Sequence, residues 1–153
     1  MTALTLGEFA VQMTNAAGAM VYAEHRALER ATQMVQVEAK RVIGTYDYGW
    51  VPLAQATVDD RLRQGFSPDE PLLRTGELRD SIERTIVSGE GYVGSNSMVA
   101  VWQELGTKNI PPRSFLMGAA VAETPAILEV VGREAEAAIM GREAAWQWTI
   151  GAL

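Results

Sequence analysis

The sequence of 153 residues predicts an α+β fold with a long N-terminal helix, a small antiparallel β-sheet with short helices, and a C-terminal helix. Near both ends of the chain, apolar residues recur every three or four positions, which is the helical period. Between them, residues 84–88 and 92–95 read as two strands joined around Gly89-Glu90-Gly91, which favours a hairpin. A chain of this length can bury its own core, so residues 1–153 are expected to form one domain.

The N-terminal helix is predicted over residues 6–43. Thr5 and Glu8 have the spacing of a capping box at its start, and Gly44 is placed to end it in the left-handed conformation. Lys40 and Arg41 fall in the last turn, where cations suit the helix dipole. The apolar seam consists of Leu6, Phe9, Met13, Ala16, Met20, Ala23 and Ala27, extended by Ala31 and Met34.

This helix is too long for a domain of this size to cover. At 1.5 Å per residue it would measure ~57 Å. Part of the seam is therefore expected to pack against other subunits. For the C-terminal half of the seam, a core stripe within the same chain is an equal alternative.

Residues 44–72 are predicted to form an extended loop. The segment is rich in turn-forming residues, carries five acids against two bases and has little apolar periodicity. A short helix through residues 54–63 is compatible with its sequence. Tyr46, Tyr48 and Trp50 are expected to be exposed and to mark a contact surface. In the isolated protein the segment is expected to be poorly ordered or to extend away from the core.

An α+β unit is predicted over residues 73–117. Thr75 caps a short helix that runs through Ile82 and buries Leu78. A second helix ends at Gly106 with a positive φ. Beyond it, Pro111 and Pro112 impose an extended approach to Phe115, and Arg113 is expected to meet Glu104 or a carboxylate of the next subunit.

Residues 118–153 are predicted to form the C-terminal helix and a tail. Thr124 and Pro125 either begin this helix or lie at a kink in one that begins near Leu116. Its inward stripe is expected to be Leu128, Val131, Ala135 and Ala138. The tail carries Trp146, Trp148 and Ile150, which favours docking onto its own domain or a neighbouring ring.

Charge and composition exclude several classes of protein. The net charge of −6 comes from segments 44–72 and 116–153, which argues against a protein that grips DNA through clustered lysine and arginine. No cysteine is present, so disulfides and thiolate metal sites are excluded. The N-terminus lacks the pattern of a signal peptide, and no apolar run is long enough for a membrane span, so synthesis in the cytoplasm is expected.

No catalytic, cofactor or metal constellation emerges. His25 is the one histidine, and no phosphate loop or dinucleotide fingerprint occurs. Asp80 and Glu83 are neighbouring carboxylates without a sign of a cleft. Asp59-Asp60 with Asp69-Glu70 would make at best a weak cation site. We expect no enzyme and no cofactor.

Three clusters resemble the neck and tail-completion proteins of tailed bacteriophages, which are head–tail joining and virion-morphogenesis proteins. That family typically reads Thr-Gly-x-Leu-x-x-Ser-Ile, then an aromatic followed by Glu-x-Gly-Thr, then Pro-x-Arg-x-Phe-Leu. The matching residues here are Thr75, Gly76, Leu78, Ser81 and Ile82, then Trp102, Glu104, Gly106 and Thr107, then Pro111, Arg113, Phe115 and Leu116. The resemblance covers about residues 50–117. Arg74 stands where the family commonly has Asp, and the tryptophan-rich tail has no counterpart in the family pattern.

The resemblance implies a structural virion protein that forms a homo-oligomeric ring, with six copies expected, at the head–tail junction or during completion of the tail. Its partners would be further copies, adjacent neck, connector and tail proteins, and genome DNA that passes through the lumen without specific binding. The motif residues Thr75, Gly76, Leu78, Glu104, Gly106, Thr107, Pro112, Arg113 and Phe115 would serve assembly. Tyr46, Tyr48, Trp50, Trp146 and Trp148 would contact adjacent rings.

Three alternatives stay open at this point. The same scaffold could act as a tail terminator that caps the tail tube. A cytoplasmic adaptor could bind a host protein through the helix 6–43. A hydrolase using Asp80 or Glu83 is the fourth hypothesis.

Overall fold

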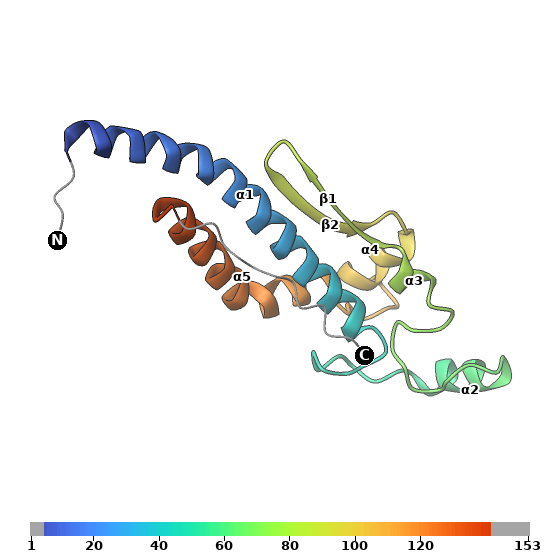
Figure 1. The fold of residues 1–153 in the computed structure, drawn as a ribbon. Coiled ribbons are helices and arrows are strands. Elements are labelled where there is room, and N and C mark those ends of the chain that lie inside the picture. Colours follow the sequence, from blue (N-terminus) through green and yellow to red (C-terminus); the bar gives the residue numbers. More distant parts are fainter. Residues whose placement is uncertain (1–4, 142–153) are drawn as a thin grey trace.

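The computed structural model describes residues 5–141 and confirms the α+β fold. A long helix, α1 (Leu6–Val42), lies between a second long helix, α5 (Leu116–Ile139), and an antiparallel hairpin (Figure 1). Three short helices, α2 (Gln55–Arg63), α3 (Glu77–Asp80) and α4 (Met98–Leu105), complete the described chain. Every other element touches α1 or connects elements that do, so α1 is the axis of the fold.

Local sequence signals set both ends of α1. The Thr5 hydroxyl accepts a hydrogen bond from the Glu8 amide at 3.2 Å, and the Glu8 carboxylate accepts one from the Thr5 amide at 2.8 Å, which is the predicted capping box. At the other end Gly44 has a φ of +96°, as the left-handed stop requires. The helix ends at Val42, one residue before the predicted end.

The hairpin pairs β1 (Ile82–Val87) with β2 (Glu90–Ser95). Val87 pairs with Glu90, so the turn consists of Ser88 and Gly89, both with positive φ as in a type I′ turn. The turn therefore lies one residue earlier than Gly89-Glu90-Gly91. At Gly91 the strand lies so close to α1 that an added Cβ would sit 2.6 Å from Thr32 Cγ2.

The core lies where the C-terminal part of α1 meets α3, α4, the hairpin and the start of α5. Phe115 and Ile82 are fully buried at its centre. The other buried members are Ala39, Val42, Ile43, Trp50, Leu78, Ala100 and Ala119. Ile82 belongs to β1 and not to α3, which corrects the prediction of a helix through this residue.

Farther along, α1 and α5 are joined by small residues and one buried charge. Ala23, Ala27 and Ala138 are buried between them. Glu134 on α5 is 1% exposed and accepts a hydrogen bond from Arg26 Nε at 2.8 Å, and its second oxygen lies 3.2 Å from Arg30 Nη1. Removing either arginine would leave a buried carboxylate less well compensated, which is the costly case for an internal ion pair.

The predicted inward stripe of α5 is partly wrong. Ala138 is buried and Ala135 half-buried, but Leu128 and Val131 are exposed. The helix turns Glu134 and Ala119 inward instead, because Glu134 pairs with arginines of α1 and Ala119 allows close packing. Pro125 lies inside α5, so the alternative of one helix beginning near Leu116 is the observed one.

The N-terminal part of α1 extends beyond the core (Figure 1). Leu6 is 90% exposed, and Phe9 and Met13 are more than half exposed. The N-terminal half of the seam is therefore not covered by the other described residues, whereas Ala23 and Ala27 are buried beside α5. None of the helices within residues 5–141 has an apolar stretch of the length needed to span a bilayer.

Two glycines of α5 provide a matched test of this packing. A Cβ at Gly118 would lie 2.5 Å from Cε2 of the Tyr48 ring, whereas one at Gly132 would meet nothing within 4 Å. We expect Gly118→Ala to lower the free energy of unfolding by about 1–3 kcal/mol through overpacking. Gly132→Ala should raise it by about 0.5–1 kcal/mol, because alanine is the better helix former. Urea unfolding measures both, and a shift of the same sign in the two variants would contradict the packing described.

Candidate assembly site

The carboxylate of Glu104 joins α4 to the start of α5. Its Oε2 accepts the amides of Phe115 at 2.8 Å and Leu116 at 2.9 Å, and its Oε1 accepts the Met117 amide at 2.9 Å. The Ser114 hydroxyl donates to the same Oε1. The first amides of a helix have no partner within the helix and carry positive partial charge, so this carboxylate stabilises the N-terminus of α5.

A tight loop brings Glu104 to that position. Gly106 has a φ of +77°, and an added Cβ would lie 3.0 Å from both the Ile110 carbonyl oxygen and the Pro112 nitrogen. The Thr107 amide donates to Ile110 O at 2.9 Å, and the Thr107 hydroxyl accepts the Ile110 amide at 3.1 Å. The positive φ predicted for Gly106 is confirmed, and the glycine is needed on two grounds, backbone conformation and space.

Arg113 does not meet Glu104, contrary to one of the two predicted pairings. Its side chain is 6% exposed and donates from Nη2 to the Val51 carbonyl at 3.0 Å, while its amide donates to Gln103 O at 2.6 Å. No carboxylate of the described residues lies within ion-pair distance of it. The four donors around Glu104 explain the difference, since they occupy the oxygens that Arg113 was expected to reach.

The other motif residues are structural. Phe115 and Leu78 lie in the core, and Gly76 is buried with a φ of +90° as the N-cap of α3. The Thr75 hydroxyl accepts the Glu77 amide at 3.4 Å, so the capping residue is Gly76 and Thr75 assists from one position earlier. Thr107 and Pro112 are exposed on the loop.

The aromatics of residues 44–50 are not the exposed contacts that were predicted. Trp50 is 9% exposed in the core, and Tyr46 and Tyr48 are partly buried against it. The Tyr48 ring meets the Trp50 ring edge to face with centroids 5.8 Å apart. Each tyrosine hydroxyl donates to a carboxylate, Tyr46 to Asp69 and Tyr48 to Glu38. Trp146 and Trp148 lie outside the described residues.

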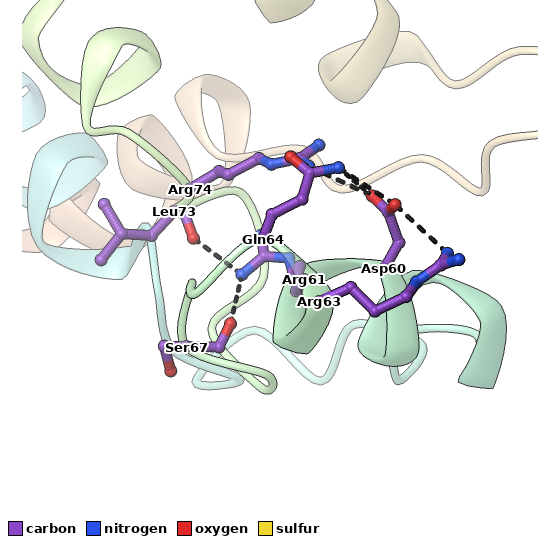
Figure 2. Close-up of polar contacts among 7 residues, drawn as sticks. All are labelled: Asp60, Arg61, Arg63, Gln64, Ser67, Leu73 and Arg74. Carbon is purple, nitrogen blue, oxygen red and sulfur yellow. Dashed lines mark hydrogen bonds and ion pairs between the residues drawn. The ribbon is translucent and has the colours of Figure 1, made fainter.

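The remainder of the 44–72 segment carries α2, which lies apart from the α1–α5 pair (Figure 1). Arg61 is 6% exposed and donates from Nη1 to Ser67 O at 3.0 Å and to Leu73 O at 2.8 Å (Figure 2). These bonds connect α2 to the loop that follows it and to Leu73, just before the Thr75–Ile82 motif. The part of the segment around α2 thus extends outward as a hydrogen-bonded unit, whereas its first residues, from Tyr46 to Trp50, pack in or against the core, which the prediction did not foresee.

Arg74 has a defined role in this unit. Its guanidinium lies over the Phe66 ring, 5.0 Å from the centroid. Its Nη2 lies 3.1 Å from Asp60 Oδ2, as Figure 2 shows. Cation–π contacts and exposed ion pairs each contribute modestly. Arginine at this position thus holds α2, a contact that the aspartate common in the resembled family could not make.

The described residues offer little for catalysis. Within residues 5–141 no group of three or more potential metal ligands is found. Asp60 is bound to Arg63, Gln64 and Arg74, and Asp69 to Tyr46, so these acids do not converge. Asp80 and Glu83 are exposed, and His25 lies exposed on α1 near Glu29.

An apolar groove was not predicted from the sequence. Two adjoining hollows of about 420 and 430 Å³ run along α1 and share Leu28, Ala31 and Ile127. We call this the α1–α5 groove. The rest of its lining is Met20, Ala23, Glu24, Ala27, Thr32, Val35, Gly91, Val93, Glu104, Leu116, Met117, Ala120, Val131, Glu134 and Ala135.

A second uncovered surface lies on α4. Met98, Val101, Trp102 and Leu105, which recur at helical spacing, are all exposed. Only Ala100 of α4 is buried. Periodicity finds such a face but does not say whether the chain itself covers it, so neither this surface nor the groove could be assigned from sequence.

Comparisons of the chain with protein family models, with curated proteins and with solved structures give no match.

Glu104→Gln tests the joint between the helices. The substitution keeps the size but places an amide donor among backbone donors, so we expect the free energy of unfolding to fall by about 2 kcal/mol. Glu136→Gln on the exposed part of α5 is the matched control and should change it by less than about 0.5 kcal/mol. Urea unfolding followed by circular dichroism compares the two, and equal effects would show that Glu104 has no special role.

Tyr48 should make the fold sensitive to alkaline pH. Burial and the hydrogen bond to Glu38 raise its pKa from 10.0 to about 12. The unfolded chain then loses this proton first as pH rises, so the free energy of unfolding falls between these two values. Tyr48→Phe should flatten that decline relative to wild type, whereas the exposed Tyr22→Phe should leave it unchanged. An identical pH profile for Tyr48→Phe and wild type would contradict the assignment.

Proposed function

We propose that this chain is a structural virion protein of a tailed bacteriophage, which forms an oligomeric ring at the neck or completes the tail during assembly. The observation that carries the proposal is the uncovered apolar surface of α1. Phe9, Val11, Met13, Val21 and Tyr22 are exposed on a helix that has no charged residue between positions 9 and 23. A helix that is apolar on several sides is typical of a buried environment, which residues 5–141 do not supply and which we assign to other copies.

The three sequence clusters support the same proposal. Their residues cap and join helices, as Glu104 and Gly106 do, and the described residues form no catalytic constellation around them. Such residues fit a scaffold whose work is assembly and not chemistry. The place in the virion rests on the resemblance of these clusters to neck and tail-completion proteins.

The charges fit a ring through which DNA passes without being held. The arginines of α1 and α2 are engaged with carboxylates or carbonyls: Arg26 with Glu134, Arg41 with Glu38 and Asp47, and Arg61 with two carbonyls. Phosphate binding depends on clustered cations that are available to the backbone. Specific or tight binding of the genome is therefore not part of the proposal.

The proposal predicts several copies of the chain in each particle, located at the head–tail junction. Particles purified from a culture that produces the chain can be examined by quantitative mass spectrometry, with the capsid protein as internal standard, and by electron microscopy with an antibody label. We expect a copy number well above one and label at the junction. Absence of the chain from particles would overturn the proposal and favour an adaptor that binds a host protein. A single copy would overturn the ring.

A further inference from the structure

We propose that the N-terminal half of α1 in one copy, Leu6–Tyr22, binds in the α1–α5 groove of a second copy. The inference rests on the proposed function in one respect, since it names the contact that would join copies in a ring.

The N-terminal half of α1 needs cover on more than one side. Leu6, Phe9 and Met13 follow the seam, but Val11 and the 71% exposed Tyr22 lie off it. Isolated helices of this length are marginal in water, so packing must supply most of their stability. Within the described residues, the end of α5 lies beside α1 between Gln12 and Arg26, where Ala137, Ala138 and Gly141 line a shared hollow.

The groove is suited to an uncharged helix. In one hollow, Leu28, Ala31 and Val35 of α1 lie between Gly91 and Val93 of β2 and a run of α5 residues. Of its three carboxylates, Glu104 is compensated by four donors and Glu134 by Arg26 and Arg30, while Glu24 is exposed to solvent. A helix segment without charges, such as residues 9–23, can therefore enter without leaving a charge unpaired.

The two surfaces also agree in size. Residues 6–22 form about 25 Å of helix, and the groove follows α1 from Met20 to Val35, about 24 Å at the same rise per residue. Its hollows are lined by 11 and 10 residues, three of them shared. This approaches the roughly 20 residues per side of a standard interface that buries about 800 Å² per partner.

A second copy is the occupant that covers both surfaces at once. The N-terminal half of α1 cannot enter its own groove, because α1 is one continuous helix and its residues from Met20 to Val35 line that groove. Each contact between two copies uses the helix of one copy and the groove of the other. Each copy therefore keeps a second binding surface for a further copy, so the contact is head-to-tail and can be repeated. Such heterologous contacts close into rings when the rotation per copy allows it.

The chain has no cysteine, which permits a direct test by cross-linking. The full-length double variant Met13→Cys/Ala31→Cys places one thiol in the middle of the exposed helix and one in the groove. At high protein concentration a short bifunctional maleimide should give a ladder of dimers, trimers and larger covalent multimers. Mixing the two single variants should give dimers only. Met13→Cys/Thr57→Cys, with the second thiol exposed on α2, is the matched control and should give no covalent multimers.

Every other pattern overturns the contact. No ladder in the double variant, or an equal ladder in the control, would show that the helix does not enter the groove. An internal cross-link in monomeric Ala31→Cys/Trp148→Cys would show that the chain's own tail occupies it. Two further outcomes separate this contact from the proposed virion role. Multimers seen by light scattering without a cross-linked ladder would refute the contact and leave the ring. A ladder from a chain that is absent from purified particles would support the contact and refute the virion role.

Discussion

The Glu104 carboxylate is the interaction on which the rest of the structure depends. It receives one hydroxyl and three amides, and so sets where α5 begins relative to α4. That start places Phe115 and Ala119 in the core, and it sets the rotation at which Glu134, farther along α5, meets Arg26 and Arg30 of α1. Helix-start carboxylates and charge-assisted hydrogen bonds are among the stronger polar contacts, so one side chain can fix two helices.

The core occupies only one end of the α1–α5 pair. Around Ile82 and Phe115 five elements converge, whereas toward the N-terminus of α1 the contact with α5 consists of alanines and the buried Glu134 with its two arginines. Alanines give close approach but bury little apolar area each, so stability should fall away from the core. The part of α1 with the largest exposed apolar side chains is thus also the part that the other described residues support least.

Sequence predicted the features that depend on neighbours along the chain. The Thr5–Glu8 box and the positive φ of Gly44 and Gly106 follow from local geometry. Contacts between distant segments were not accessible in this way. The sequence around Trp50 would be the same whether its side chain were exposed or buried. Its burial depends on residues far away in the sequence, such as Phe115 and Leu78 of the same core cluster. The same limit applies to Leu128 and Val131, because the ion pair of Glu134 overrides the apolar stripe.

The candidate surfaces have a physical property in common that periodicity alone could not reveal. α1 from Phe9 to Ala23 has no charged residue, and α4 has only Glu104, whose oxygens are occupied by α5. Monomeric proteins usually place charges on exposed helix faces, because these maintain solubility and disfavour association. Several charges are instead paired within the chain, in the buried contacts of Glu134 with Arg26 and Arg30 and in the partly exposed Arg41 bridges and Arg74–Asp60 contact. In the proposed ring, the uncharged stretch of α1 from Phe9 to Ala23 is the part that another copy would cover.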